Sequence, residues 1–469
     1  MKEKIKDTIV DLLLDGVKNK LDSVKENYKW QKLFVSTGDF FVNNPDVLVK
    51  FEDDLYSDFD IIEGEIWVID NTISYVGKSK SQDEVLKEQF DRAVDCKGNL
   101  LMPGFKNAHT HSGMTIMRTY CDGLPLQEWY MDKVFPLEGR LNGDDCALLT
   151  KLAILEYLTS GITAIYDMYL TPPTIAKACM ESGMRAIVSD GLNNYGPKLE
   201  VEEERFLTIN GKSPLVSYMI NLHAEYTTDY ELMEKFTELA HKYELPIYMH
   251  NSETKREVLE CIERYGKTPT AVFEDLNMFK YGGGGFHCVH MSDEDIAIFK
   301  KHDLSVVTNP ASNLKLASGV APIQRFLDEN INVAIGTDGP SSNNALDMFR
   351  EMYLTTALAK VREDDASGVP ALSVLKMATL GGAKAMGLKD CDVLKAGKQA
   401  DIILIDLNQP NMQPVIDIPR NIVYSGCKQN VKMTMIAGKI LYEDGEFFID
   451  MSAEDIYKEA AKIRDRVCE

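Results

Sequence analysis

Between residues 100 and 337, short apolar runs alternate with stretches in which apolar positions follow a helical period. The runs have the length of buried strands, and the stretches between them, such as 231–244 and 293–303, have the length of helices. Alternating strand and helix predict a parallel sheet. Eight such units over about 250 residues predict a closed (β/α)8 barrel. The runs are 100–108, 163–169, 184–189, 215–222, 246–249, 286–289, 304–308 and 333–337.

The two ends of the chain have a different pattern, with short strands and turns at 31–100 and again at 391–450. Strand-rich segments at both ends can pair into one domain. We therefore expect an α/β protein, a (β/α)8 TIM barrel at 101–390 with a small β-sandwich domain built from both chain ends. A helical pattern at 451–469 predicts a C-terminal helix. Residues 1–30 predict an amphipathic N-terminal helix, either docked on the protein's own surface or serving as a homo-oligomer contact.

Composition excludes several partners. The 469 residues carry 51 Lys and Arg against 73 Asp and Glu, a formal net charge of −22. This charge repels nucleic acid and anionic membrane surfaces, and no apolar run approaches the roughly 18 residues of a transmembrane helix. We expect neither a nucleic-acid nor a membrane partner. The nine cysteines include no Cys-x-x-Cys pair, which is typical of reduced thiols in the cytoplasm.

Histidines gather where the predicted strands end. Six of the eight in the chain lie at these ends, namely His109, His111, His223, His250, His287 and His290. In a barrel, the C-terminal ends of the strands surround one mouth, where active sites lie. Core packing explains one or two buried histidines, but hardly six. The pattern therefore indicates a metal site at the mouth of the barrel.

Four residues form the predicted ligand set. His109 and His111 lie two apart on the first strand and face the same way. His250 and Asp338, from the fifth and eighth strands, complete a set of three imidazoles and one carboxylate. This set suits one divalent ion, with zinc favoured and iron or manganese also compatible. The fourth strand ends at 221–223 without the lysine that bridges two metals in related barrels, so we expect a single ion.

Two carboxylates are candidates for proton transfer. Glu253 follows His250 by three residues and can carry a proton between activated water and a ring nitrogen, as a non-ligating glutamate does in nucleobase deaminases of another fold. The alternative is an acid at a helix start, stabilised by the helix dipole. Asp338 lies in Gly-Thr-Asp-Gly, where it is either a turn residue or a ligand that also accepts a proton from water.

Seven motifs together resemble the amidohydrolase superfamily. Within it they are most similar to the 5'-methylthioadenosine/S-adenosylhomocysteine deaminases and their chlorohydrolase-like relatives, the triazine hydrolases. The resemblance runs from about residue 33 to the C-terminus. The motifs are PGFKNAHTHSGMTIMR, LPLQEWYMDKVFPLEGRL, HAEYTTD, PIYMHNSET, FHCVHMSDEDI, NPASNLKLASGVAPI and GTDGPSSNNALDMFREM.

The resemblance implies roles for matching positions. It implies one zinc held by His109, His111, His250 and Asp338, and proton transfer by Glu253, His287 and Asp338. It also implies a substrate pocket in which Glu138 holds ribose hydroxyls, His223 contacts the substrate and Trp129 covers it. Glu138 can otherwise be a solvated helix acid beside Arg140, and Trp129 can be simple core packing.

One departure concerns the substrate's 5'-substituent. Family members that accept S-adenosylhomocysteine carry an arginine after strand three, where this chain has Asp190. Glu225 replaces a family proline after strand four. We expect these two acids to make the outer pocket acidic, which disfavours the carboxylate of a homocysteine tail and tolerates a neutral or cationic 5'-substituent.

Three functional hypotheses follow. The first is a zinc aminohydrolase that converts adenosine, 5'-deoxyadenosine or 5'-methylthioadenosine to the inosine analogue and ammonia, with S-adenosylhomocysteine disfavoured. The second retains the chemistry and changes the ring to guanine, an oxidised purine, a pterin or a triazine. The third is an inactive barrel that serves as a binding scaffold, which the complete ligand set disfavours.

Overall fold

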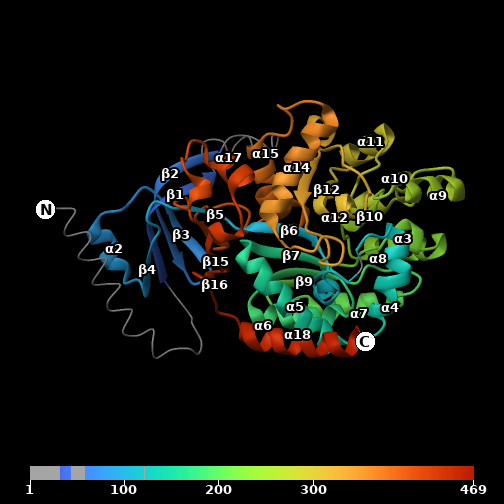
Figure 1. Cartoon of the computed structure of the whole chain (residues 1–469), viewed down its shortest axis with the longest axis horizontal. Helices are drawn as coiled ribbons and strands as arrows, with labels where there is room; N and C mark the ends of the chain where they lie inside the picture. Colours follow the sequence, from blue (N-terminus) through green and yellow to red (C-terminus); the bar gives the residue numbers. More distant parts are fainter. Residues whose placement is uncertain (1–31, 44–58, 121, 469) are drawn as a thin grey trace. The chain divides into compact units, whose positions relative to one another are not determined.

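The computed structural model describes residues 32–43, 59–120 and 122–468 (Figure 1). These residues form two compact units. The smaller unit contains the described residues before Phe105 together with Lys389–Val415 and Gln429–Phe448. The larger unit contains Phe105–Leu388, Ile416–Lys428 and the segment from Ile449 onward. The helix predicted for residues 1–30 lies outside the described residues.

Eight parallel strands form the centre of the larger unit. They are β6 (Phe105–Thr110), β7 (Ile162–Met168), β8 (Arg185–Ser189), β9 (Val216–Tyr218), β10 (Ile247–Asn251), β11 (Gly283–His287), β12 (Ser305–Thr308) and β13 (Asn332–Ile335). They pair in two ladders, β6-β7-β8-β9 and β10-β11-β12-β13. Single parallel bridges join Ala224 to His250 and Thr110 to Asp338, one at each seam between the ladders. The strands therefore follow one another in chain order around a ring, and the predicted (β/α)8 fold class is confirmed.

Helices of the larger unit lie outside the strands (Figure 1). The first half contains α3 (Leu126–Glu128), α4 (Phe135–Glu138), α5 (Gly143–Thr159), α6 (Pro172–Ser182), α7 (Leu199–Ile209), α8 (Tyr230–Lys242), α9 (Lys255–Tyr265) and α10 (Pro269–Asp275). The second half contains α11 (Asp293–Lys301), α12 (Pro310–Lys315), α13 (Ile323–Asp328), α14 (Met348–Glu363), α15 (Ala371–Lys376), α16 (Gly382–Ala385), α17 (Ile418–Arg420) and α18 (Ala453–Val467). The helical pattern at the C-terminus corresponds to α18.

The first apolar run, 100–108, is two strands rather than one. Leu100–Pro103 forms β5, which pairs with strands of the smaller unit, and β6 begins at Phe105 in the barrel. The change of partner occurs at Gly104, whose N–H donates to Asp401, whereas the N–H of Phe105 donates to Gly161. An apolar run buried throughout carries no sign of such a change, because both halves need the same residue types.

The sixth barrel strand begins earlier than its apolar run at 286–289. Gly283, Gly284 and Gly285 are part of β11. A Cβ atom on Gly283 would lie 1.9 Å from the carbonyl oxygen of Ile247, and one on Gly284 would lie 2.0 Å from that of Ser305. The strand therefore needs glycine because the backbones of both neighbouring strands approach it closely.

The smaller unit is built on one nine-stranded sheet from both ends of the chain. Its strands are β1 (Lys32–Asn43), β2 (Phe59–Ile69), β3 (Thr72–Gly77), β4 (Arg92–Asp95), β5, β14 (Ile402–Ile405), β15 (Val431–Ile436), β16 (Lys439–Glu443) and β17 (Glu446–Phe447). The order is β17-β16-β15-β14-β5-β1-β2-β3, with β4 beside β1. Apolar residues from both chain ends, among them Val68, Leu101 and Ile402, share one core. Helix α2 (Gln82–Glu88) connects β3 and β4.

The second sandwich segment also differs from the predicted domains. Residues 416–428 were expected in the second sandwich segment, but Ile416–Lys428 belongs to the larger unit. Gly426 packs so closely on Phe349 of α14 that an added Cβ would lie 3.0 Å from its ring. The hydroxyls of Thr356 and Tyr424 lie 3.2 Å apart and can bond each other. These contacts bind the segment to α14, and a local composition rich in apolar residues does not reveal them.

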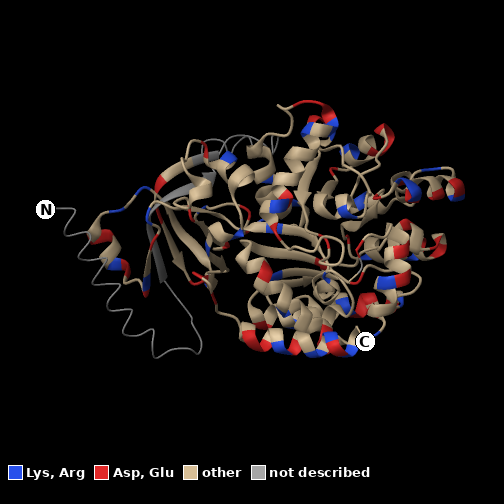
Figure 2. Ribbon diagram, in the orientation of Figure 1, with Lys and Arg blue, Asp and Glu red and all other residues tan. Residues whose placement is uncertain are grey.

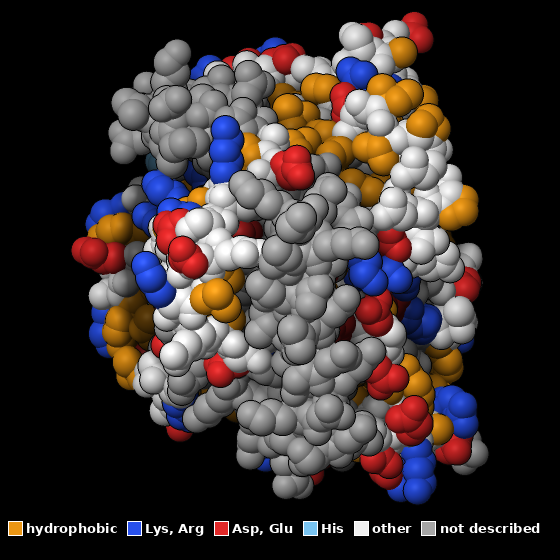
Figure 3. Space-filling view, turned by 90° about the vertical axis from the view of Figure 1, so that its left-hand side faces the viewer, with side chains coloured by type: hydrophobic (Ala, Val, Ile, Leu, Met, Phe, Trp, Pro, Cys, Tyr) orange, Lys and Arg blue, Asp and Glu red, His pale blue; other side chains and the backbone are white. Residues whose placement is uncertain are grey.

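The described surface carries both signs of charge. Acidic and basic residues are interspersed along the ribbon in Figure 2, and their side chains are interspersed on the face that Figure 3 shows. Helix α18 carries both kinds of residue along its length. In the part of the chain that the structure describes, no helix is long and apolar enough to cross a membrane.

Candidate metal centre

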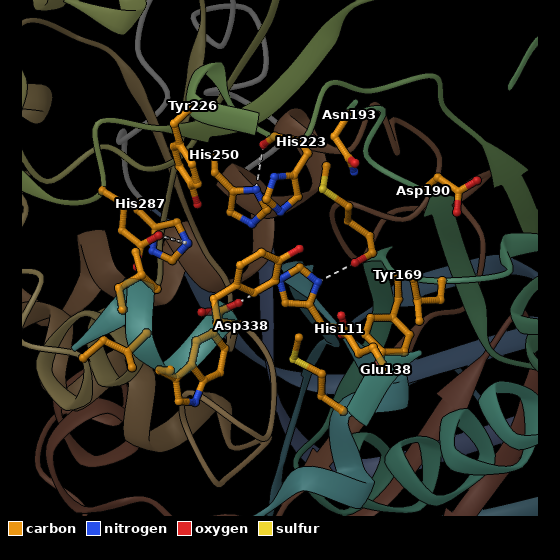
Figure 4. Close-up of a pocket in the computed structure, with 18 residues that line it drawn as sticks. His111, Glu138, Tyr169, Asp190, Asn193, His223, Tyr226, His250, His287 and Asp338 are labelled. Atoms are coloured by element: carbon orange, nitrogen blue, oxygen red, sulfur yellow. Dashed lines mark hydrogen bonds and ion pairs between the residues drawn. The ribbon is translucent and has the colours of Figure 1, made fainter. Parts of the chain in front are cut away.

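The C-terminal ends of four barrel strands converge on one cluster of side chains. His109 lies at the end of β6, and His111 follows it as the residue before the short helix at Ser112–Met117. His250 lies in β10, and Asp338 follows β13. Figure 4 shows His111, His250, His287 and Asp338 facing a common space. The predicted ligand set is therefore brought together, although its members are up to 229 positions apart in the chain (from His109 to Asp338).

His109 lies deepest in this cluster. It is fully buried, its ring stacks on Phe286 at 3.8 Å, and its centroid lies 4.7 Å from that of His111 and 4.9 Å from that of His250. Neither ring nitrogen has a hydrogen-bond partner among the described residues. Burial lowers the pKa of His109 to about 3, so the imidazole is neutral. A buried, neutral imidazole with a nitrogen lone pair free of hydrogen bonds can bind a divalent metal.

Two overlapping groups of side chains can hold the ion. Ligand atoms of His109, His111 and Asp338 lie within 4.8 Å of one another, and so do those of His109, His250 and His287. The four predicted ligands are divided between the two groups, which share His109. His287 enters the second group, although it was predicted to transfer protons rather than to bind metal. Nitrogen donors with one carboxylate suit zinc, so the residues fit the expected divalent ion.

Backbone carbonyls orient two of the imidazoles. Nδ1 of His250 lies 2.8 Å from the carbonyl oxygen of His223, and Nδ1 of His111 contacts the carbonyl oxygen of Met168. Each ring thus presents Nε2 to the cluster. Such outer contacts fix the tautomer of a histidine ligand. Burial opposes protonation of His111, but its contacts with Asp338 raise its pKa to about 9 in the ion-free chain.

Asp338 is held on both carboxylate oxygens. Its Oδ1 lies 3.0 Å from Nε2 of His111 and 3.5 Å from Nε2 of His109. Its Oδ2 accepts hydrogen bonds from the hydroxyls of Ser312 at 2.5 Å and Ser342 at 2.9 Å. Although burial opposes the charge, the two histidines hold the pKa of Asp338 well below its usual range. With φ of +56°, Asp338 also turns the chain, as the interpretation as a turn residue expects; its role as a ligand and proton acceptor stays a prediction.

Glu253 projects from the loop between β10 and α9. Thr254 is the N-cap of α9, so Glu253 precedes the helix and is not part of its first turn. Its carboxylate accepts a hydrogen bond from the Ser318 hydroxyl at 3.2 Å and lies 3.8 Å from Nε2 of His287. Burial raises the pKa of Glu253, which favours the protonated form. The interpretation as a helix-start acid is wrong, since Glu257 takes that position.

His287 ends β11 and is 1% exposed. Its Nδ1 lies 2.7 Å from Oδ1 of Asn313, which leaves Nε2 toward Glu253 and the cluster. With φ of +69°, the residue departs from the strand conformation, and the left-handed turn directs its side chain into the mouth.

Glu138 is a pocket residue rather than a solvated one. It ends α4, is 8% exposed and lines the same pocket as His111 and His250. Burial raises its pKa to about 7, partly offset by Tyr169 and His111. Arg140, the neighbour that suggested a solvated acid, donates instead to the carbonyl oxygen of Val467 at 2.9 Å.

His223 and Trp129 also line the pocket. His223 is half-buried, and burial lowers its pKa to about 4, so its imidazole is neutral. Its Nδ1 lies 2.9 Å from the Thr227 hydroxyl. Trp129 is buried, and its indole N–H has no partner among the described residues. A tryptophan in a packed core normally bonds its N–H, so a position at the pocket wall accounts for Trp129 better than core packing does.

The expected acidic rim is corrected by the structure. Glu225 does not line the pocket but forms a bidentate pair with Arg264, at 3.0 and 2.6 Å. Asp190 does line the pocket, but it forms an ion pair with Arg205 of α7. Both acids therefore have a cationic partner. The sequence does not reveal these partners, because Arg205 and Arg264 lie 15 and 39 positions further along the chain.

The wall of the pocket carries no strong cation. Apolar and aromatic side chains make up half of it, and the carboxylates are Glu138, Asp190, Glu253 and Asp338. Among the described residues that line the pocket, there is no lysine or arginine. The described wall therefore offers carboxylate acceptors, but no lysine or arginine that neutralises an anionic ligand.

Several residues at the site were not predicted from the sequence. They are Ser312, Ser318, Ser342, Asn313 and Glu257, which support the predicted residues by hydrogen bonds. Serine and asparagine are common in any loop, so nothing distinguishes these positions. Glu257 had a signal, the capping-box spacing from Thr254, which predicts the start of a helix but not its role beside Glu253.

Comparisons with known proteins agree with the fold and the cluster. A model of the amidohydrolase family matches residues 100–441. The chain is 38% identical to a 5-methylthioadenosine/S-adenosylhomocysteine deaminase of Caldanaerobacter subterraneus, with 86% of this chain and 94% of that protein covered. It is 36% identical to a 5'-deoxyadenosine deaminase of Methanosarcina acetivorans, with 86% and 93% covered.

A solved structure is similar over nearly the whole chain. It is an adenosine deaminase from Xanthomonas campestris with bound zinc, which superimposes with a TM-score of 0.84 at 30% identity. The superposition covers 93% of this chain and 98% of that one. The resemblance stated from the sequence motifs is thereby confirmed, and so is the expectation of a divalent metal cofactor.

Proposed function

The chain belongs to the amidohydrolase family, and on this premise we propose that it deaminates an adenine nucleoside to the inosine analogue. Adenosine, 5'-deoxyadenosine and 5'-methylthioadenosine are the proposed substrates. The observation that carries the proposal is Glu253, a buried carboxyl of raised pKa beside the histidine cluster and close to His287. The names of the relatives, deaminases of such nucleosides, support it.

The proposed metal ligands are His109, His111, His250 and Asp338. When bound, such an ion would lower the pKa of a water molecule toward about 7, which would supply a nucleophile at neutral pH. The neutral state of His109, caused by its burial, agrees with this role. Zinc is the proposed ion because three imidazoles and one carboxylate are its preferred donors.

Three side chains move or stabilise protons and charge in the proposed reaction. Asp338 accepts a proton from the water that attacks C6 of the purine. Glu253, whose pKa is raised by burial, donates its proton to the adjacent ring nitrogen. His287 stabilises the charge that develops on the attacking oxygen. The proton on Asp338 then passes to the amino group, the C6–N bond breaks and ammonia leaves. The remaining proton of the attacking water returns to the carboxylate of Glu253 as the C6 carbonyl forms, so one water is consumed for each ammonia released.

The pocket wall supports a nucleoside rather than a nucleotide. Glu138 is proposed to accept hydrogen bonds from the ribose hydroxyls, and His223 and Trp129 to contact the purine. A 5'-phosphate would enter a pocket with four carboxylates and no lysine or arginine in its described wall. Desolvating a phosphate without a cationic partner is strongly unfavourable, so adenosine monophosphate is excluded as a substrate.

The same argument applies to S-adenosylhomocysteine. Asp190 takes the place of the arginine that the resemblance associates with this substrate, and Arg205 is already paired with Asp190. No free cation remains in the described wall to bind the carboxylate of the homocysteine tail. Turnover of S-adenosylhomocysteine is therefore proposed to be weaker than that of 5'-deoxyadenosine, because a cation is missing rather than because the rim carries two free acids.

Ammonia release by the zinc-loaded chain tests the proposal. The panel contains adenosine, 5'-deoxyadenosine, 5'-methylthioadenosine, S-adenosylhomocysteine, adenosine monophosphate, guanine and 8-oxoguanine. The proposal expects release from the first three, weaker release from the fourth and none from the fifth. Release from the free bases alone would replace the nucleoside with another heterocycle and would refute the role of Glu138.

A further inference from the structure

The backbone that carries Glu253 is held by a second buried carboxylate. Oε1 of Glu257 accepts the N–H of Ser252 at 2.9 Å. Its Oε2 accepts the N–H of Glu253 at 2.8 Å and that of Thr254 at 3.3 Å. Glu257 is only 2% exposed, and among the described residues no lysine, arginine or histidine forms an ion pair with it. The N–H groups of three consecutive residues are therefore the groups that stabilise the carboxylate of Glu257.

This arrangement exceeds what the start of a helix needs. In a capping box, the acid bonds the N–H of the N-cap residue, which is Thr254 in α9. Glu257 reaches two residues further back, to Ser252 and Glu253. The acids of the other three capping boxes in the described chain, Glu84, Asp145 and Asp295, each bond only one backbone N–H.

The loop is fixed from its other side as well. The carbonyl oxygen of Ser252 accepts the N–H groups of Val289 at 3.1 Å and His290 at 2.9 Å. Ser252 has φ of +52°, a left-handed conformation that costs free energy for a residue with a side chain and persists only where the surroundings enforce it. Together these contacts leave Glu253 one backbone position, from which its side chain reaches Ser318 and His287.

We propose that Glu257 is a positioning residue, whose carboxylate fixes the backbone at Ser252–Thr254 and so aims Glu253 at the ring nitrogen that it protonates. The inference rests on the proposed function, since it assigns Glu257 to the same proton transfer. Burial and the nearby Glu253 raise the pKa of Glu257 to about 7, so ionising this carboxyl costs free energy in the folded chain. A glutamine at this position would also cap the helix, and it would not bury a charge. The presence of a glutamate therefore agrees with a role beyond stability.

Glu257→Gln tests the proposal in the zinc-loaded chain. The amide group has one acceptor in place of two and turns an N–H donor toward one of the three backbone donors. A displacement of about 1 Å at a catalytic group costs about 100-fold in rate. We expect kcat for 5'-deoxyadenosine to fall about 100-fold, KM to change less than about threefold and zinc to remain stoichiometric. Glu257→Asp, which shortens the reach, should give an intermediate loss.

Asp295→Asn is the matched control. Asp295 is fully buried, belongs to the capping box of α11 with Ser292 and accepts one backbone N–H at 2.9 Å. It lies outside the pocket wall. The variant should lose thermal stability to a similar degree as Glu257→Gln, but retain kcat within about twofold. Equal losses of kcat in both variants would show that Glu257 acts only through stability.

Two further measurements separate this inference from the proposed function. Hydrogen exchange of a peptide covering 250–256 should be at least about tenfold faster in Glu257→Gln than in wild type and unchanged in Asp295→Asn. Affinity for a 6-hydroxy-1,6-dihydropurine nucleoside should fall with kcat, while affinity for the inosine product stays constant. An active wild type with a Glu257→Gln variant of undiminished kcat overturns the positioning role alone. A wild type that neither binds nor deaminates nucleosides overturns the proposed function, while the exchange measurement still tests the backbone contacts.

Discussion

The buried carboxyl of Glu138 makes a quantitative prediction about pH. Burial raises its pKa to about 7, and only the ionised form offers both oxygens as charged acceptors to the two hydroxyls of a ribose. A group of this pKa is about one-tenth ionised near pH 6 and about nine-tenths ionised near pH 8. The contribution of the two ribose hydroxyls to kcat/KM should therefore rise about tenfold between these pH values.

The assay compares adenosine with 2',3'-dideoxyadenosine at each pH. Both substrates use the same metal and the same proton-transfer residues, so the ratio of their kcat/KM values cancels the titration of every group except those that contact the hydroxyls. Charge-assisted hydrogen bonds contribute about 1.5–3 kcal/mol each. An amide retains one acceptor oxygen, so Glu138→Gln should lose one such bond, lower the ratio near pH 8 by about 10-fold to 100-fold and make it independent of pH.

Glu128→Gln serves as the control, because Glu128 is an exposed acid on the neighbouring helix α3. It should leave both the ratio and its pH dependence unchanged. The reasoning is refuted if the wild-type ratio is the same near pH 6 and pH 8, or if Glu138→Gln retains the full ratio near pH 8.

Three other predictions concern catalysis, the metal and stability. Glu253→Gln should bind stoichiometric zinc and lower kcat by about 100-fold or more, because it has no proton to donate; a near-wild-type rate would remove Glu253 from the mechanism. Chelation should abolish ammonia release and lower Tm by at least about 5 °C, both reversed by zinc, since an ion bound only to the folded chain stabilises it; an unchanged Tm would argue against the cluster as its site. Burial raises the pKa of Glu351 to about 8, so the folded chain retains a proton that the unfolded chain releases above its pKa of about 4.5. The free energy of unfolding should therefore fall by about 1.4 kcal/mol per pH unit between these two pKa values. The Tm of Glu351→Gln minus that of wild type should increase from about pH 5.5 to about pH 7.5. A difference in Tm that stays constant with pH would contradict this.

The barrel and its metal cluster were predictable because both depend on local sequence. Each buried strand is an apolar run of its own, and the first polar residue after it marks the end of the strand. His109, His250 and Asp338 are such residues, so the barrel geometry alone predicted that they meet.

The pairing of charges was not predictable in the same way. Asp190 and Glu225 were expected as free acids, and both are neutralised by arginines from helices that follow. Helix periodicity gives the face on which an arginine lies, but not which loop of the barrel that face reaches. The sequence therefore gives the number of acids near the pocket correctly, but not the net charge that they and their partners produce.

Backbone geometry also limits what can be predicted from the sequence. The change of partner at Gly104 and the glycines of β11 depend on how closely neighbouring strands approach. The role of Glu257 depends on three amide hydrogens that belong to no side chain. Sequence patterns describe side chains, so they do not show which backbone groups a buried carboxylate binds.

Incubation of the zinc-loaded chain with adenosine in H2(18)O tests the central claim most directly. Mass spectrometry of the product and an ammonia assay would be read on the same sample. Hydrolytic deamination predicts inosine with one 18O atom at C6 and one equivalent of ammonia for each nucleoside consumed. Unchanged adenosine, or a product without 18O, would contradict the account.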